Sequence, residues 1–208
     1  MKRRLGLVLA VAVLLPGCPA SVYQLNHLPD STPLPQPLPI SSSTDFMHTP
    51  SHYMFPLSVA GFDRVALFRY DTNGLDVSAG YNAGTPECPI RLTIYVAPTP
   101  RMSFVGADPA VVRSQEASWL NGAYVHWKQE IARGHPLAQL KSEDERTQDG
   151  VPGKKAIYTI GADESRLFVF VVDRKWFLTY RQSFPGACSA QADSSIHDFF
   201  ARWRGRAG

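Results

Sequence analysis

The sequence lacks most of the features that readily reveal a function. Its 208 residues include only three cysteines. Its longest apolar run, from Leu5 to Leu15, is about 11 residues, whereas a helix needs ~20 to cross a bilayer. No Gly-x-Ser-x-Gly motif is present. The chain therefore carries no motif that assigns a reaction, and its patterns bear mainly on location and architecture.

A surplus of charge is also missing. The formal net charge of +3 is matched by Lys2, Arg3 and Arg4, so a chain processed after them is formally neutral. A neutral domain offers no electrostatic footprint for nucleic acid. We therefore expect no nucleic-acid partner.

The first 18 residues are the most informative stretch. Basic residues, a short apolar run and a small residue before a cysteine are typical of an export signal. Leu15-Pro16-Gly17-Cys18 resembles the lipobox of bacterial lipoproteins, which implies a signal peptide over residues 1–17 and lipid on Cys18. An ordinary secretory signal is the alternative. We expect attachment to the periplasmic face of the envelope, and Pro19 after the cysteine favours the outer membrane over the inner one.

Lipidation leaves Cys88 and Cys188 as an even pair in an oxidising compartment. We predict a disulfide between them. Two separate buried thiols are the alternative, because sequence alone does not establish that the two residues are close.

Proline and serine dominate the next segment. Proline fixes the backbone and removes an amide donor, so residues 18–52 are interpreted as a lipidated, extended tether. A single domain is then expected over residues 53–208, a length suited to one core. The prolines and serines that mark the tether are Pro29, Pro33, Pro35, Pro37, Pro39, Ser41, Ser42 and Ser43.

Within that domain the apolar pattern predicts strands and two helices. Asn73-Gly74 between two alternating runs predicts a hairpin. Asp108 and Pro109 begin a long amphipathic helix, and a second helix is expected to be capped near Ser194. The expected strands cover 64–70, 75–81, 91–97, 137–148 (a charged edge strand), 155–160, 166–172 (a central strand) and 176–184.

This order predicts an α+β domain in which an antiparallel sheet of six to seven strands packs against a long central helix and a C-terminal helix. Over Tyr53 to Arg204, and in the run Phe62 to Pro98, the layout resembles the PsbP-like two-layer sandwich found in small exported bacterial lipoproteins. That resemblance carries no signature motif, so it implies a fold and no site residue.

Two short motifs suggest ligands but are better explained otherwise. His48 and His52 have the spacing of a metal pair, yet Pro50 lies between them and a zinc site needs three or four ligands. Gly150 to Lys155 has glycines too close together for a phosphate loop and precedes a strand. We expect a linker and a turn, and no metal or cofactor.

Two further groups invite a functional interpretation. His126 and Glu130 lie one turn apart on the long helix, where a base with an orienting carboxylate and a solvated pair are the alternatives; the solvated pair is favoured. Arg202 to Arg206 could touch anionic lipid, or its cations could complement the helix dipole while Trp203 packs inward. The inward-packing interpretation is favoured.

Three functions follow as hypotheses. The preferred one is a lipid-anchored envelope module without catalytic activity that binds a partner or assists assembly. The second is a small-molecule or lipid carrier with a cleft between the sheet and the long helix, lined by Trp119, Tyr124 and Trp127. The third is a hydrolase using His126. An apolar cavity would favour the carrier.

Overall fold

The computed structural model describes residues 28–102, 104, 106–203 and 205. The strands are β1 (Pro33–Pro39), β2 (Phe46–His48), β3 (Tyr53–Phe55), β4 (Ser58–Val59), β5 (Phe62–Asp71), β6 (Val77–Gly84), β7 (Pro89–Pro98), β8 (Gln139–Gln148), β9 (Val151–Ile160), β10 (Asp163–Val172) and β11 (Trp176–Pro185). The helices are α1 (Pro109–Gly134), the short η1 (Gly186–Cys188) and α2 (Ser189–Arg202).

One large antiparallel sheet organises the chain. Its order is β1-β5-β6-β7-β11-β10-β9-β8, with β4 paired to β5, which makes nine strands. The prediction of six to seven strands is therefore wrong. The strands of this sheet that it missed, β1 and β4, come from the proline-rich segment and the residues just after it, where the sequence shows no clear alternation of apolar and polar side chains. It also missed β2 and β3, which pair with each other in a separate two-stranded sheet.

The strands that do alternate lie where the pattern placed them. Asp71 to Leu75 turn β5 into β6, and the expected central strand β10 pairs with both β9 and β11. The charged strand β8 lies at one edge of the sheet. Charge on an edge strand discourages pairing with another chain, as expected from the sequence.

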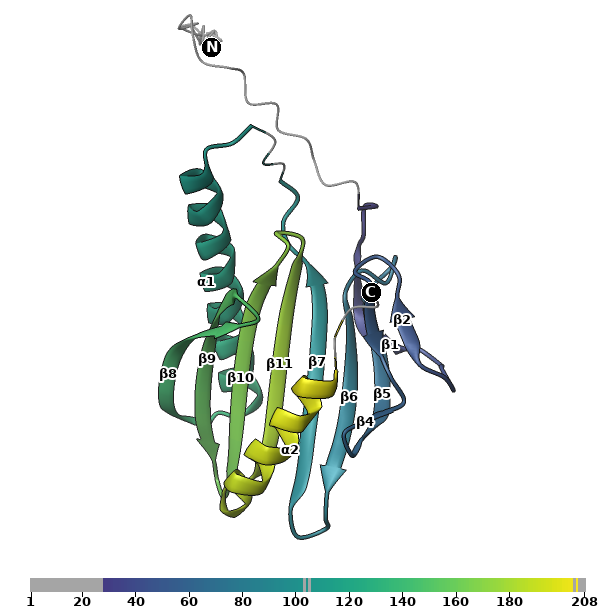
Figure 1. The fold of residues 1–208 in the computed structure, drawn as a ribbon, viewed down its shortest axis with the longest axis vertical. Helices are drawn as coiled ribbons and strands as arrows, with labels where there is room; N and C mark the ends of the chain where they lie inside the picture. Colours follow the sequence, from purple (N-terminus) through teal and green to yellow (C-terminus); the bar gives the residue numbers. More distant parts are fainter. Residues whose placement is uncertain (1–27, 103, 105, 204, 206–208) are drawn as a thin grey trace, which may run out of the picture.

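The two helices cover opposite faces of the sheet, which corrects the prediction of two layers. In β10, Leu167 and Val169 pack with α1, whereas Phe168 and Phe170 face the cluster that contains α2. Successive side chains of a strand point to opposite faces, so both faces of β10 are buried. The sheet is thus the middle layer, with α2 in front of it and α1 behind it in Figure 1.

Each helix covers only part of its face. Leu120, Tyr124 and Ile131 of α1 pack on β9 and β10, whereas Phe199 of α2 reaches across to Phe62 and Tyr81. On each face the sheet therefore extends well beyond its helix, and these uncovered areas are where hollows form.

The described part of the expected tether, residues 28–52, lies against the domain. β1 pairs with β5 through Leu38 and Arg69, and proline suits this place because an edge strand leaves amide positions unpaired. His48 is buried, with Nδ1 2.5 Å from the Ser51 hydroxyl and Nε2 2.7 Å from the Gly74 carbonyl oxygen. This segment is part of the fold.

The predicted disulfide is present between Cys88 and Cys188, whose Cα atoms lie 5.8 Å apart. It joins the β6–β7 connection to η1. The second helix begins at Ser189 and not near Ser194, because η1 leads directly into it. The bond thus ties the start of α2 to the loop between β6 and β7.

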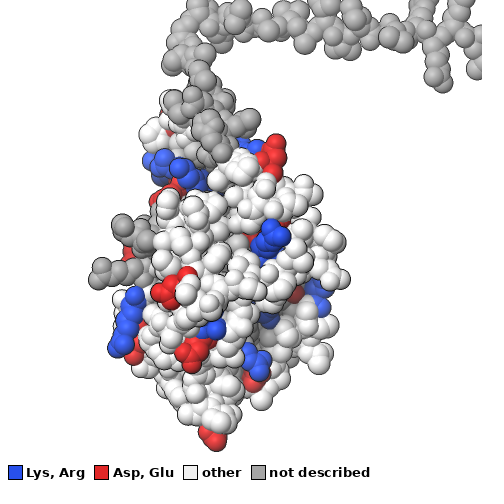
Figure 2. All heavy atoms as spheres, turned by 90° about the vertical axis from the view of Figure 1, so that its right-hand side faces the viewer, with Lys and Arg blue, Asp and Glu red and all other residues white. Residues whose placement is uncertain are grey.

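Figure 2 shows the face beside the β1 edge of the sheet, where acidic and basic side chains are interspersed on a mostly uncharged surface. Within the described residues, no helix has the length and apolar character needed to cross a membrane.

Candidate functional site

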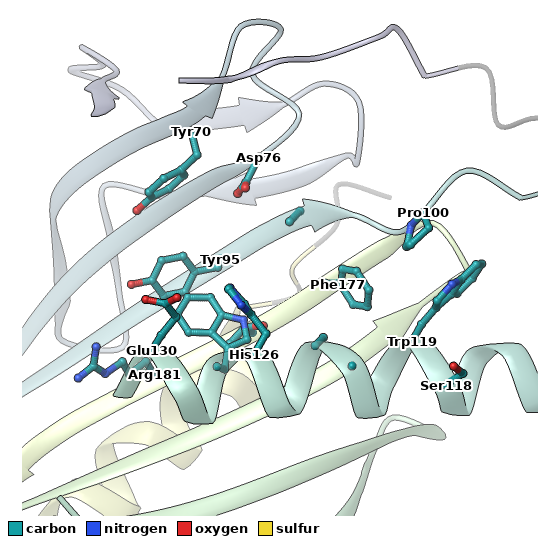
Figure 3. A pocket seen from close by; sticks show the side chains of 15 residues that line it. Tyr70, Asp76, Tyr95, Pro100, Ser118, Trp119, His126, Glu130, Phe177 and Arg181 are labelled. Atoms are coloured by element: carbon teal, nitrogen blue, oxygen red, sulfur yellow. The ribbon is translucent and has the colours of Figure 1, made fainter. Parts of the chain in front are cut away.

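A groove of about 750 Å³ lies between α1 and the part of the sheet that α1 leaves uncovered. Its floor is formed by side chains of β5, β7 and β11 and by Asp76, which immediately precedes β6, and α1 forms one wall (Figure 3). A volume of ~300–1,000 Å³ is typical of small-molecule pockets.

Aromatic side chains supply most of the apolar lining. The ring centroids of Tyr95 and Trp127 are 4.5 Å apart, and those of Tyr70 and Tyr95 are 6.3 Å apart, so the three rings form a continuous surface at one end. Trp119 and Phe177 line the other end, beside Pro100. Rings of this kind bury large apolar areas at little loss of side-chain entropy.

Asp76 places a carboxyl group on the aromatic side of the groove. Burial, with a smaller contribution from the charge of Asp71, raises the pKa of Asp76 to about 7. The neighbouring Tyr70 hydroxyl lies 2.9 Å from the Ser78 hydroxyl, and burial also raises the pKa of Tyr70. This side of the groove therefore presents two poorly solvated polar groups, of which the Asp76 carboxyl group changes protonation near neutral pH.

Basic and acidic side chains lie at the Tyr95 end. Arg181 donates to Nε2 of His135 at 2.9 Å, and Glu130 pairs with Arg133 at 2.5 Å. His126 lines the groove, with its ring centroid 6.2 Å from that of Trp127. No hydrogen bond joins His126 to Glu130 in the described structure, where the Glu130 carboxylate pairs with Arg133.

The predicted cleft residues fall on two sides of α1. Trp119 and Trp127 line the groove, as the carrier hypothesis expected. Tyr124 does not: it packs on β9, and its hydroxyl donates to Glu143 at 2.8 Å. The face of α1 that packs on the sheet is centred on Tyr124. Trp127 lies at the border of this face and is half-buried. The sequence did not predict Tyr70, Asp76, Tyr95 and Phe177 as lining residues. They come together only because the pairing of β5, β6, β7 and β11 places their segments side by side.

The other predicted sites have structural roles or lie elsewhere. Gly150 has φ +78° and forms the turn between β8 and β9. Trp203 is buried and donates from Nε1 to the Met54 carbonyl oxygen at 2.7 Å, as the inward-packing interpretation expected. His48 is buried while His52 is exposed. Cys18 and its lipidation lie outside the described residues.

Across the part of the chain that the structure describes, no three His, Cys, Asp or Glu side chains gather closely enough to hold a metal ion.

Comparisons with known proteins give likenesses to solved structures and to no named family. No protein-family model matches the chain, and no curated protein matches it. The solution structure of cyanobacterial PsbP (CyanoP) from Synechocystis sp. PCC 6803 is similar, with a TM-score of 0.40 and 11% identity. The match covers 74% of this chain and 89% of that one.

Proposed function

We propose that this chain is a lipid-anchored envelope protein, without chemistry of its own, that binds a small amphipathic molecule in the groove beside α1. The observation that supports this most is the groove's lining, in which a continuous set of aromatic side chains lies beside polar ones such as Asp76, His126 and Arg181. The aromatic residues are Tyr70, Tyr95, Trp119, Trp127 and Phe177. Apolar pockets with a small number of converging polar groups are typical of ligand sites.

The polar groups suggest how such a ligand would lie. Its apolar or aromatic body would pack between Trp119 and Trp127, and its head would reach Asp76 and Tyr70. An uncharged or basic head suits a poorly solvated carboxyl group, because an acidic head would repel its ionised form. The cavity favours this carrier function over the assembly module that the sequence alone suggested.

Gly122 offers a direct test. It lies on the groove wall, and nothing stands within 4 Å of a Cβ built at this position, so the Cβ of Gly122→Phe meets no neighbour and its ring would occupy the groove. Gly134→Phe is the matched control, because it is equally uncrowded but does not line the groove.

The experiment measures binding of N-phenyl-1-naphthylamine, a neutral aromatic dye, by its fluorescence increase. We expect the wild type and Gly134→Phe to bind it alike, and Gly122→Phe to bind at least ~10-fold more weakly, about 1.4 kcal/mol. Equal binding by all three proteins, or none by the wild type, would count against the proposal.

A further inference from the structure

A second hollow, of about 520 Å³, lies on the opposite face of the sheet. The cluster that contains α2 covers β11, β7 and β6 on this face, so the outer strands β8 and β9 stay open next to the helix. Arg146, Lys155, Phe168 and Gln182 line the hollow from four neighbouring strands, and His197 lines it from α2.

Gln182 is the feature that points to a ligand. Its side chain is 1% exposed, yet neither its amide nitrogen nor its amide oxygen has a hydrogen-bond partner among the described residues. Buried polar groups are almost always paired, and each unpaired one calls for an explanation. An amide offers a donor and an acceptor side by side, so the complementary group is another amide or a carboxyl.

Two cations lie farther along the same hollow. The Arg146 guanidinium is 5.7 Å from the Phe168 ring centroid, and Lys155 Nζ is 5.9 Å from it. Neither forms an ion pair with a carboxylate in the described structure, whereas Arg166 is held by Glu164 at 2.6 Å and also by Asp193. Asp149 also lines the hollow. The two unpaired cations outnumber it, which favours an anion.

Strand register places these groups in a fixed order. Gln182 pairs with Arg166, and the next inward-facing position along β10 is Phe168, which pairs with Lys155. One step farther, Phe170 pairs with Gly153, which pairs with Arg146. Along β10 from Arg166 toward Phe170, the Gln182 amide is therefore met first, then Lys155 and then Arg146.

Beyond the cations the hollow becomes aromatic. A smaller adjoining hollow of about 170 Å³ shares Gln148, Asp149 and Phe200 with it. Phe170, Tyr180 and Trp203 line this end. Along the sheet the order is thus amide, positive charge and apolar surface.

We propose that this second hollow binds an N-acylated α-amino acid with a bulky apolar side chain, either free or as the C-terminus of a peptide. Gln182 pairs with the ligand's amide, Arg146 and Lys155 hold its carboxylate, and the side chain lies against Phe170 and Tyr180. In such a molecule the amide, the carboxylate and the side chain are joined to one carbon, so a single small ligand carries a partner for each of the three kinds of group that line the hollow. The site is independent of the groove beside α1.

The test is an NMR titration of the full chain with N-acetyl-L-phenylalanine, following the side-chain NH₂ signals of Gln182. We expect these signals to shift on binding. Three related probes each lack one feature: the methyl ester lacks the carboxylate, 3-phenylpropionate the amide and N-acetylglycine the side chain. Each should bind at least ~10-fold more weakly. A longer acetylated peptide ending in phenylalanine distinguishes a peptide terminus, if it binds more tightly, from a free amino acid derivative.

Variants separate binding from folding. Gln182→Leu and Lys155→Gln should each weaken binding at least ~10-fold. Lys154→Gln should not, because Lys154 lies over the Tyr124 ring on the other face. Gln182→Leu should unfold at or above the wild-type temperature, since it removes unpaired polar atoms; if it fails to fold, Lys155→Gln still decides. Unchanged binding in both variants, equal binding of the methyl ester or of inorganic phosphate, or no shift at all would overturn the proposal.

Discussion

At the scale of single residues, Asp76 places a carboxyl group where little water reaches it. Its pKa of about 7 in the folded protein compares with 3.8 for the unperturbed group. The folded state therefore holds a proton more tightly than the unfolded state does, so this residue's contribution to stability is fully present below pH 3.8 and is lost as the pH rises through 7.

Asp76→Asn removes that loss, because the amide does not titrate. We expect the variant to exceed the wild type in unfolding free energy by roughly 1–3 kcal/mol above pH 7, after allowance for solvent contact, and by much less below pH 4. Urea unfolding at several pH values measures the difference, with exposed Asp163→Asn as a control. A difference that does not change with pH would contradict the assigned environment.

Residue identities alone could not have located this carboxyl group. Asp76 stands on the polar side of an alternating strand, which predicts solvent, and only the aromatic rings of β5, β7 and α1 exclude water from it. Trp119 and Trp127 were predictable as cleft residues because both lie on one long helix. Gln182 was not, because its isolation depends on the packing of α2 over β11.

At the scale of elements, the sequence predicted the strands with a clear apolar pattern and missed the strands that lack one, such as β1 and β4. Strand β7 follows period-two burial, β10 is buried on both faces as its continuous apolar run predicts, and α1 begins at Pro109, after its N-cap Asp108. Strand β1 breaks the usual rule because prolines rarely form strands, and it pairs only along one edge. The helix faces were not predictable, because the sequence shows that both helices are amphipathic but not which side of the sheet each covers.

The disulfide is the covalent link between elements that are far apart in sequence. Cys88 and Cys188 are separated by 100 residues, and a loop of this length restricts the unfolded chain strongly. The Cys88→Ser/Cys188→Ser double variant should lose ~2–4 kcal/mol of unfolding free energy. Equilibrium denaturation measures this, and unchanged stability would show that the bond does not constrain the fold.

At the scale of the whole molecule, the proposal joins a lipid anchor to a binding domain. Residues 28–52 lie along the sheet, so the chain between Cys18 and the first described residues is short. We predict that Cys18→Ala moves the protein from the membrane fraction to the soluble one, or leaves an unprocessed precursor. Acyl label that persists on the variant would contradict the anchor.

The account's central claim is that the groove beside α1 holds a small molecule. The most direct measurement is native mass spectrometry of the full chain isolated from the cells that make it, compared with the Gly122→Phe and Gly134→Phe variants. We predict a small-molecule adduct on the wild type and on Gly134→Phe, and its loss from Gly122→Phe. An adduct that persists on Gly122→Phe, or a wild-type protein that carries none, would contradict the claim.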